Sequence, residues 1–434
     1  MKSVSKNLNS NISQKLFYLL VLVLFLRVDL VFENNTPTGG DMGAHIVAID
    51  TFIKDFMPNL QINGWSNDWF GGYPLYYFYF PLPAVITYIL NLVFSFGIAF
   101  KIMVVMSTIL VVYSIEKLMR KTSNQISIYG ATAGLFYVFT ESFTIYGGNL
   151  ASTLAGQFSF AYSLAFANLS IFYLIKSKNN FRFTISSIFL ALCLLSHLIP
   201  FIIYSPIYAF YWLSKSQNLN QRILSIFIFL ALASRWSVSL LMNLEYTTNM
   251  SYTPFSRLDD LIKKDILPII FILIGLLITK HKNLIKNKTL NLFELYLIFS
   301  SILLYFFVPE GALWNGRLVP FFNLGIIFLF FKALEIFIED IYLYQQGLNV
   351  LTLLFFGGTI YCLYIFYEKW SANQSYLNVY VPIILLIIIF AIINLNNVVI
   401  QLNMLIVSII FSTISFLPHW LNWNFTGSER KNDW

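Results

Sequence analysis

The chain has 434 residues, of which 58% are hydrophobic, 18% aromatic and only 11% charged. Soluble globular domains carry roughly 25% charged residues, so this chain has too little polar surface to coat a water-exposed body. The net charge of +7 is not a nucleic-acid signature, because Lys and Arg fall in short segments between apolar runs and are not clustered on one face. The composition excludes a soluble enzyme and predicts a membrane protein.

The apolar residues form long uncharged runs, such as 16–26, 267–279 and 379–394. A membrane-spanning helix needs about 20 mostly apolar residues, whereas a β-barrel would show alternating segments of about ten. We therefore predict an all-α fold class: one polytopic membrane domain over residues 1–434, with about 13 transmembrane helices.

The N-terminal run at 16–32 resembles a signal peptide, but no small-residue cleavage site follows it, so we expect an uncleaved first span. Loops rich in Lys and Arg favour the cytoplasmic side of a membrane. This predicts a multi-pass protein of the plasma membrane, with a cytoplasmic N-terminus and an extracytoplasmic C-terminus. The basic loops are 1–15, 119–122, 176–182, 215–222 and 280–288.

This orientation requires that the apolar segment 81–98 does not cross the membrane fully. The segment opens with Pro81 and Pro83, which disfavour a continuous long helix. We therefore expect a re-entrant or juxtamembrane helix, and a first extracytoplasmic loop, 33–98, that carries juxtamembrane helices.

Asp41 and His45 form the candidate catalytic pair within this long first loop. If a helix begins at the sequence MGAHIV, then Asp41 stands at its N-terminus. Asp41 would then be a helix N-cap, or a general base that takes a proton from an acceptor hydroxyl. The aromatic residues of the loop and its glycine pairs, Gly39-Gly40 and Gly71-Gly72, favour the second interpretation.

The second half of the loop supplies three candidate substrate-binding residues, Asp68, Trp69 and Tyr73. Asp68 precedes a Gly-Gly pair, so a turn-capping role is the alternative for its carboxylate.

The segment FTIYGGNLASTLAGQFSF places further polar candidates, Tyr146, Asn149 and Gln157, at the entrance of a span. Polar groups at membrane depth are costly and often functional. The alternative is packing between helices through small residues.

Three residues at the ends of later helices complete the candidate binding set: His197, Trp314 and Arg317. Arg317 suits a phosphate by bidentate pairing, or it reaches out to the membrane interface. His197 binds substrate or provides a hydrogen bond at a helix end. The cysteines, Cys193 and Cys362, have no partner spacing, and no metal site or nucleotide motif is present in the sequence.

Six motifs in chain order resemble the bacterial membrane proteins named "6-pyruvoyl-tetrahydropterin synthase-related", which look like members of the GT-C superfamily of membrane glycosyltransferases. The motifs are TPTGGDMGAH, GWSNDWFGGYPLYYFYFPLP, FTIYGGNLASTLAGQFSF, LSHLIP, LWNGRLVPFF and WNFTGSERK.

The resemblance implies transfer of a sugar from a polyprenyl-phosphate donor to an extracytoplasmic acceptor, which would be an envelope glycan, lipid or protein. It implies Asp41 as the base and Arg317 as the contact of the lipid phosphate. It leaves the cofactor unknown, with a divalent cation beside the phosphate as an open alternative. It also implies that residues 419–434 begin a further extracytoplasmic domain, and it involves no nucleic acid.

Two other functions stay open at this stage. One is a transporter or flippase of envelope lipids or glycans, which would place charged sites near the bilayer midplane and show internal repeats. The other is a non-catalytic scaffold subunit of envelope assembly. Loss of turnover in Asp41→Asn would separate the enzyme from the scaffold, and substrate counterflow in vesicles would identify a transporter.

Overall fold

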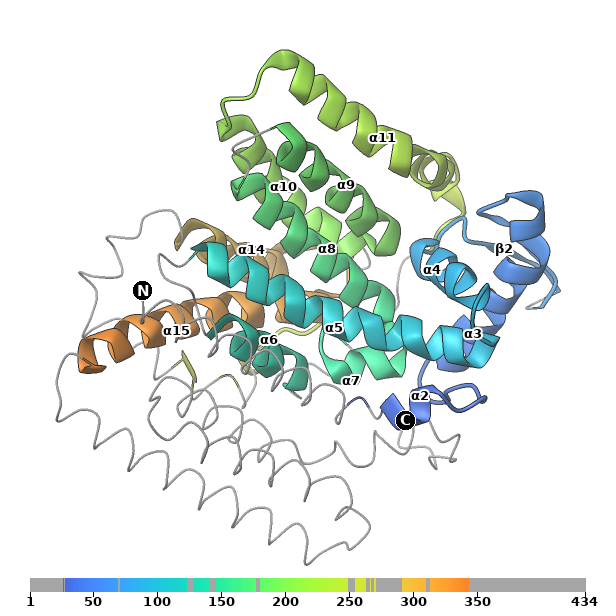
Figure 1. The fold of residues 1–434 in the computed structure, drawn as a ribbon, viewed down its shortest axis with the longest axis horizontal. Coiled ribbons are helices and arrows are strands. Elements are labelled where there is room, and N and C mark those ends of the chain that lie inside the picture. Colours follow the sequence, from blue (N-terminus) through green and yellow to red (C-terminus); the bar gives the residue numbers. More distant parts are fainter. Residues whose placement is uncertain are drawn as a thin grey trace, which may run out of the picture.

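A computed structural model describes residues 26, 28–68, 71–122, 129–140, 146–176, 180–248, 254–262, 266, 269–270, 291–309 and 313–342. This part of the chain is mostly helical, as predicted, with one small hairpin in the first loop (Figure 1). The predicted number of about 13 spans stays a prediction, because residues 343–434 lie outside the described residues.

The first loop forms a short chain of helices and a hairpin, followed by the helix α4. The hairpin is antiparallel, and it pairs Gly64 with Leu75 and Ser66 with Tyr73. The elements are α2 (Val28–Val31), α3 (Met42–Thr51), the π-helix η1 (Phe52–Phe56), the 3-10 helix η2 (Met57–Asn59), β1 (Gly64–Ser66), β2 (Tyr73–Leu75) and α4 (Leu82–Asn91).

The remaining helices make the bundle on which this loop rests. They are α5 (Phe96–Thr122), α6 (Tyr129–Phe139), α7 (Leu150–Ser152), the π-helix η3 (Thr153–Gln157), α8 (Phe158–Ile175), α9 (Asn180–Ser196), α10 (Leu198–Ser214), α11 (Leu219–Met242), the 3-10 helix η4 (Leu244–Tyr246), α12 (Leu258–Leu261), α14 (Asn291–Phe307), the 3-10 helix η5 (Asn315–Leu318) and α15 (Val319–Tyr342).

Several of these helices are long and apolar enough to cross a membrane. Within the described ranges, four stretches qualify by length and composition: Phe96–Met119, Leu150–Ile175, Leu219–Met242 and Asn315–Ala333. In contrast, α4 has ten residues and a length of about 15 Å, which is half of a hydrocarbon core of about 30 Å.

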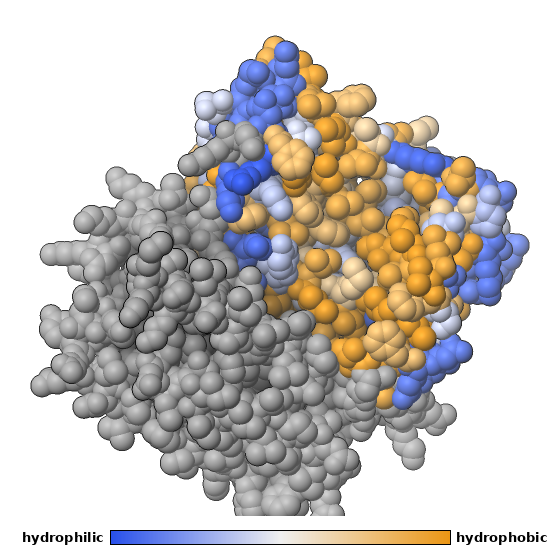
Figure 2. Space-filling model, viewed as in Figure 1, coloured by the Kyte–Doolittle hydropathy of each residue, from blue (hydrophilic) through white to orange (hydrophobic). Residues whose placement is uncertain are grey.

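The helix α8 lies at the centre of the bundle, between α5, α9 and α10 (Figure 1). Its many Ala and Ser residues let neighbouring backbones approach closely, and 89% of the span Leu150–Ile175 is buried. The helix α11 is the opposite case, because only 17% of its apolar window is buried. Hydrophobic side chains dominate the visible face between the polar loop before α11 and the first-loop hairpin (Figure 2). This belt is the surface that lipid would cover.

Lys101 attaches the start of the first loop to α5. Its buried ammonium group donates hydrogen bonds to the carbonyl oxygens of Leu30 and Glu33, both at 2.7 Å, and to Oδ1 of Asn35 at 2.6 Å. Three oxygen acceptors solvate the charge inside the protein, so burial of this lysine is tolerated.

We expect Lys101→Met to destabilise the protein by about 1–3 kcal/mol, because the three oxygens would lose their buried donor. Thermal unfolding of the purified protein in detergent measures this change. Lys117→Met is the matched control on the same helix, since the Lys117 ammonium group lies over the ring of Tyr113 without burial of this kind. An equal loss of stability in both variants would contradict the role of Lys101.

Candidate functional site

Asp41 directly precedes α3, but its side chain does not cap that helix. Instead, Oδ2 of Asp41 accepts a hydrogen bond from Nε2 of Gln157 at 3.2 Å, and the carboxylate is exposed. The backbone N–H of Asp41 donates to the carbonyl of Ala155 at 2.9 Å. The first loop is therefore docked on the broken helix that precedes α8, and Asp41 stands at the contact.

Two glycines make this contact possible. A Cβ atom on Gly40 would lie 2.3 Å from the carbonyl oxygen of Ala155, and a Cβ on Gly156 would lie 2.9 Å from Cβ of Asp41. Both glycines have positive φ angles, +52° and +107°, a region that other residues rarely adopt. The glycines of the sequences GGD and AGQ thus allow the backbones of these two segments to approach closely at the candidate site.

Gln157 connects Asp41 to Arg317. Nη1 of Arg317 donates to Oε1 of Gln157 at 2.8 Å and to the carbonyl of Tyr146 at 3.2 Å. The carboxylate, the amide and the guanidinium group therefore form one continuous path of hydrogen bonds. The three residues come from segments that are far apart in the sequence: the start of α3, the end of η3 and the short helix η5. The structure thus brings together three of the residues that the sequence analysis singled out.

His45 lies one helical turn after Asp41 and packs between aromatic rings. Its ring centroid is 4.8 Å from that of Phe158 and 5.4 Å from that of Tyr79. Burial lowers the pKa of His45 to about 4, although the charge of Asp41 and a hydrogen bond with the backbone of Gly156 act in the opposite direction. The imidazole is therefore neutral at neutral pH, and it flanks the carboxylate without a positive charge.

Tyr79 lies beside the candidate site, and the sequence analysis did not identify it. Burial raises the pKa of its hydroxyl to about 12, while the neighbouring Ser159 and Arg317 lower that pKa and Asp41 raises it. The ring of Tyr79 lies 5.4 Å from that of His45, beside the candidate site. Tyr79 belongs to the sequence LYYFYFPLP, in which three aromatic residues directly precede it, and no spacing in that run distinguishes it.

An aromatic cluster lies beside Arg317. The ring of Tyr146 makes edge contacts with Trp314 and Phe255, with centroids 5.2 and 5.9 Å apart. Asn315 fixes this cluster, because its side-chain amide bonds both backbone groups of Phe255 and the carbonyl of Tyr305. The side-chain amide of Asn315 therefore has a structural role. The sequence analysis did not single out this residue.

Asn149 and Asp68 are bonded within the fold in ways that explain their presence without a ligand. The buried Asn149 caps α7, since its Oδ1 accepts from the N–H of Ser152 at 2.8 Å and its Nδ2 donates to the carbonyl of Thr140. Asp68 accepts from the hydroxyls of Thr51 at 2.5 Å and Ser66 at 2.8 Å, and these bonds lower its pKa. Both residues brace the segments that carry the site.

The other predicted contacts have different positions. Tyr73 is half-buried in β2, and burial raises the pKa of its hydroxyl. His197 caps α10, because its Nδ1 accepts from the N–H of Ile199 at 3.2 Å, and its ring packs against Phe80 and Phe160. Trp69 lies outside the described residues.

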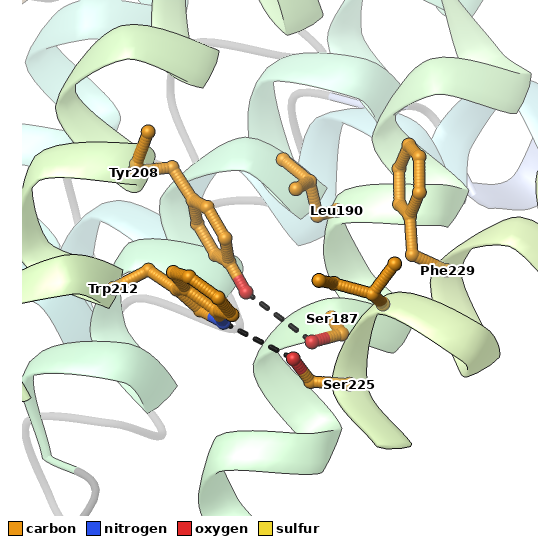
Figure 3. A pocket seen from close by; sticks show the side chains of 8 residues that line it. Ser187, Leu190, Tyr208, Trp212, Ser225 and Phe229 are labelled. Carbon is orange, nitrogen blue, oxygen red and sulfur yellow. Dashed lines mark hydrogen bonds between the residues drawn. The ribbon is translucent and has the colours of Figure 1, made fainter. Parts of the chain in front are cut away.

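A pocket of about 200 Å³ lies between α9, α10 and α11, at the opposite ends of α9 and α10 from His197. Its polar atoms bond each other: Tyr208 pairs with Ser187, and Nε1 of Trp212 donates to Ser225 at 3.1 Å (Figure 3). The remaining lining is apolar, so this pocket offers no reactive groups. Among the described residues, no group of three or more His, Cys, Asp or Glu side chains is arranged to hold a metal ion.

Comparison with known proteins identifies the fold. No protein family and no curated protein match the sequence. Two crystal structures of ArnT from Cupriavidus metallidurans match the structure. The apo form has a TM-score of 0.55 and 13% sequence identity, and covers 96% of this chain and 78% of ArnT. The form bound to undecaprenyl phosphate has a TM-score of 0.52 and 14% identity, and covers 94% and 77% of the respective chains. The chain therefore shares the fold of ArnT.

The lowered pKa of His45 predicts a pH dependence of stability. Between pH 6.5 and 4 the unfolded chain binds a proton at His45 that the folded protein does not, so stability falls as the pH falls through this window. The shift corresponds to a loss of up to about 3 kcal/mol at pH 4. Unfolding midpoints measured from pH 7.5 to 4 should fall less steeply in His45→Gln than in wild type. Equal slopes would contradict the buried neutral state of His45.

Proposed function

We propose that the protein is a membrane glycosyltransferase that moves a sugar from a polyprenyl-phosphate donor to a hydroxyl of a cell-envelope acceptor. Asp41 is the general base, and the reaction takes place at the extracytoplasmic surface of the plasma membrane. The observation that carries this proposal is the path from the Asp41 carboxylate through Gln157 to Arg317, at the end of the spans Leu150–Ile175 and Asn315–Ala333.

The two charged ends of this path match the two sides of a glycosyl transfer. The Asp41 carboxylate takes the proton of the acceptor O–H while the acceptor oxygen bonds the anomeric carbon of the sugar. The bond from that carbon to the donor phosphate breaks, and the oxygen of the polyprenyl phosphate keeps the electron pair. Arg317 faces the resulting negative charge, which a planar guanidinium group binds well. The proton ends on Asp41 and passes to water.

The surroundings support this assignment of roles. The carboxylate is exposed, so an acceptor can reach it, while Arg317 is half-buried beside the aromatic cluster of Tyr146, Phe255 and Trp314. Aromatic rings pack against the apolar faces of a sugar or a prenyl chain. A neutral His45 adds no positive charge that would compete for the carboxylate.

The fold gives independent support. ArnT, with which this chain shares the GT-C fold, has been crystallised with undecaprenyl phosphate, a polyprenyl phosphate. A fold alone does not specify an activity, so the site residues must carry the functional argument.

We expect Asp41→Asn to lower turnover by at least about a hundredfold, the usual contribution of a positioned general base. Transfer from a panel of polyprenyl-phosphate sugars in proteoliposomes measures this. Asp50→Asn is the matched control, because Asp50 lies on the same helix and forms an exposed ion pair with Lys54. Unchanged turnover in a folded Asp41→Asn variant would remove Asp41 from the mechanism.

We expect Arg317→Met to weaken binding of a polyprenyl monophosphate by about ten- to a hundredfold, the contribution of a charge-assisted hydrogen bond. Binding of the lipid in detergent, followed by tryptophan fluorescence, tests this without turnover. Arg235→Met serves as the control, since Arg235 is bonded to the carbonyl of Leu60 at the hairpin. Equal affinities in the Arg317 variant and wild type would place the phosphate elsewhere.

A further inference from the structure

We propose that Gln157 is a positioning residue that keeps the charges of Asp41 and Arg317 apart while it holds both in place. This inference rests on the proposed function, because it assigns Asp41 to the acceptor and Arg317 to the donor phosphate. It differs from the expectation that Gln157 binds substrate.

The polarity of the amide fits this task. A glutamine side chain has a donor end and an acceptor end, and here the NH₂ group faces the carboxylate while the carbonyl oxygen faces the guanidinium group. Each end meets the charge that it stabilises. A carboxylate at position 157 would repel Asp41, and a hydrocarbon would bond neither partner.

The alternative to this spacer is a direct ion pair between Asp41 and Arg317. An opposite charge at hydrogen-bond distance favours the ionised form of a carboxylate and so makes it a weaker base. The same pair would engage the guanidinium group that the donor phosphate requires. The amide therefore preserves two functions that a salt bridge would cancel.

The backbone fixes the spacer beside the base. The π-helix η3 ends at Gln157, and the carbonyl two residues earlier, on Ala155, accepts the N–H of Asp41. Gly156, with φ +107°, turns the chain between these two contacts. A single local structure thus sets the position of Asp41 and the position of the amide that bonds it.

The other titratable groups around Asp41 come from α3 and from three further segments. His45 from α3, with a pKa of about 4, and Tyr79 from the segment before α4, with a pKa of about 12, are both neutral between pH 5 and 9. Tyr73 from β2 acts on Tyr79, and burial raises its pKa as well. Arg317 from η5 stays charged throughout. None of these groups is a carboxylate, so an infrared carboxylate band does not report on them.

The test is an infrared pH titration of the purified full-length protein without substrate. The carboxylate band of Asp41 is isolated by subtraction of the same protein carrying Asp41→Asn. In Gln157→Glu the midpoint of this band should move to higher pH than in wild type, because a second carboxylate lies beside Asp41. In Gln157→Leu the midpoint should move to lower pH, because Asp41 and Arg317 pair directly.

Opposite shifts in the two variants support the inference, since loss of local structure would not reverse sign with the charge at position 157. Absent shifts, or shifts in one direction, overturn it. The same substitutions at Gln217, in the loop before α11, are the controls and should leave the midpoint unchanged.

Turnover is measured separately, so the two proposals fail in different ways. Opposite shifts of the Asp41 midpoint in the two Gln157 variants, with no transfer of any sugar, would contradict the proposed function. The same result would still support the positioning role of Gln157. Sugar transfer that depends on Asp41, together with unchanged Asp41 midpoints in the Gln157 variants, would contradict only the inference about Gln157.

Discussion

The break in the span Leu150–Ile175 is the constraint on which the site depends. An unbonded backbone group costs several kcal/mol in a lipid environment, so a span can leave helical geometry only where another part of the protein satisfies it. Here the N–H of Asp41 satisfies the carbonyl of Ala155. The first loop and the broken span therefore require each other, and the position of Asp41 follows from a backbone bond before its side chain does anything.

The protein treats its charged groups in two contrasting ways. Between α14 and α15, Lys332 and Glu294 are buried and pair directly. Such a pair is strongly destabilising to break and suits the attachment of one helix to another. At the candidate site the opposite charges are joined through an amide, and the carboxylate stays exposed. The direct pair holds two helices together, whereas Asp41 and Arg317 are each bonded to Gln157.

Much of this arrangement follows from local sequence, and the remainder does not. Hydropathy gives the helices, and the motifs GGD, AGQ and NGR mark positions where a backbone approaches closely or a polar group enters a span. The partnership of Asp41 with Gln157 spans 116 residues, and no spacing rule predicts such a contact. Sequence could not separate Asn149, a helix cap, from Gln157, a bridge, because both are polar residues near glycines in one segment. Tyr79 likewise could not be distinguished within a run of five aromatic residues, 76–80.

The π-turn at η3 has a consequence for how this site can change over evolution. Its i to i+5 bonding takes in one residue more than an α-helical turn, and each residue turns an α-helix by about 100°. Loss of one residue from Thr153–Gln157 would rotate one side of the break against the other by about that angle. The amide would then face away from Asp41, or Asn168 would leave its bonds with Ser114 and Tyr204. A chain with this bundle but one residue fewer here would keep its core and lose the hydrogen-bonded link from Asp41 through Gln157 to Arg317. The extra residue therefore distinguishes chains that have the candidate site from chains that share only the fold.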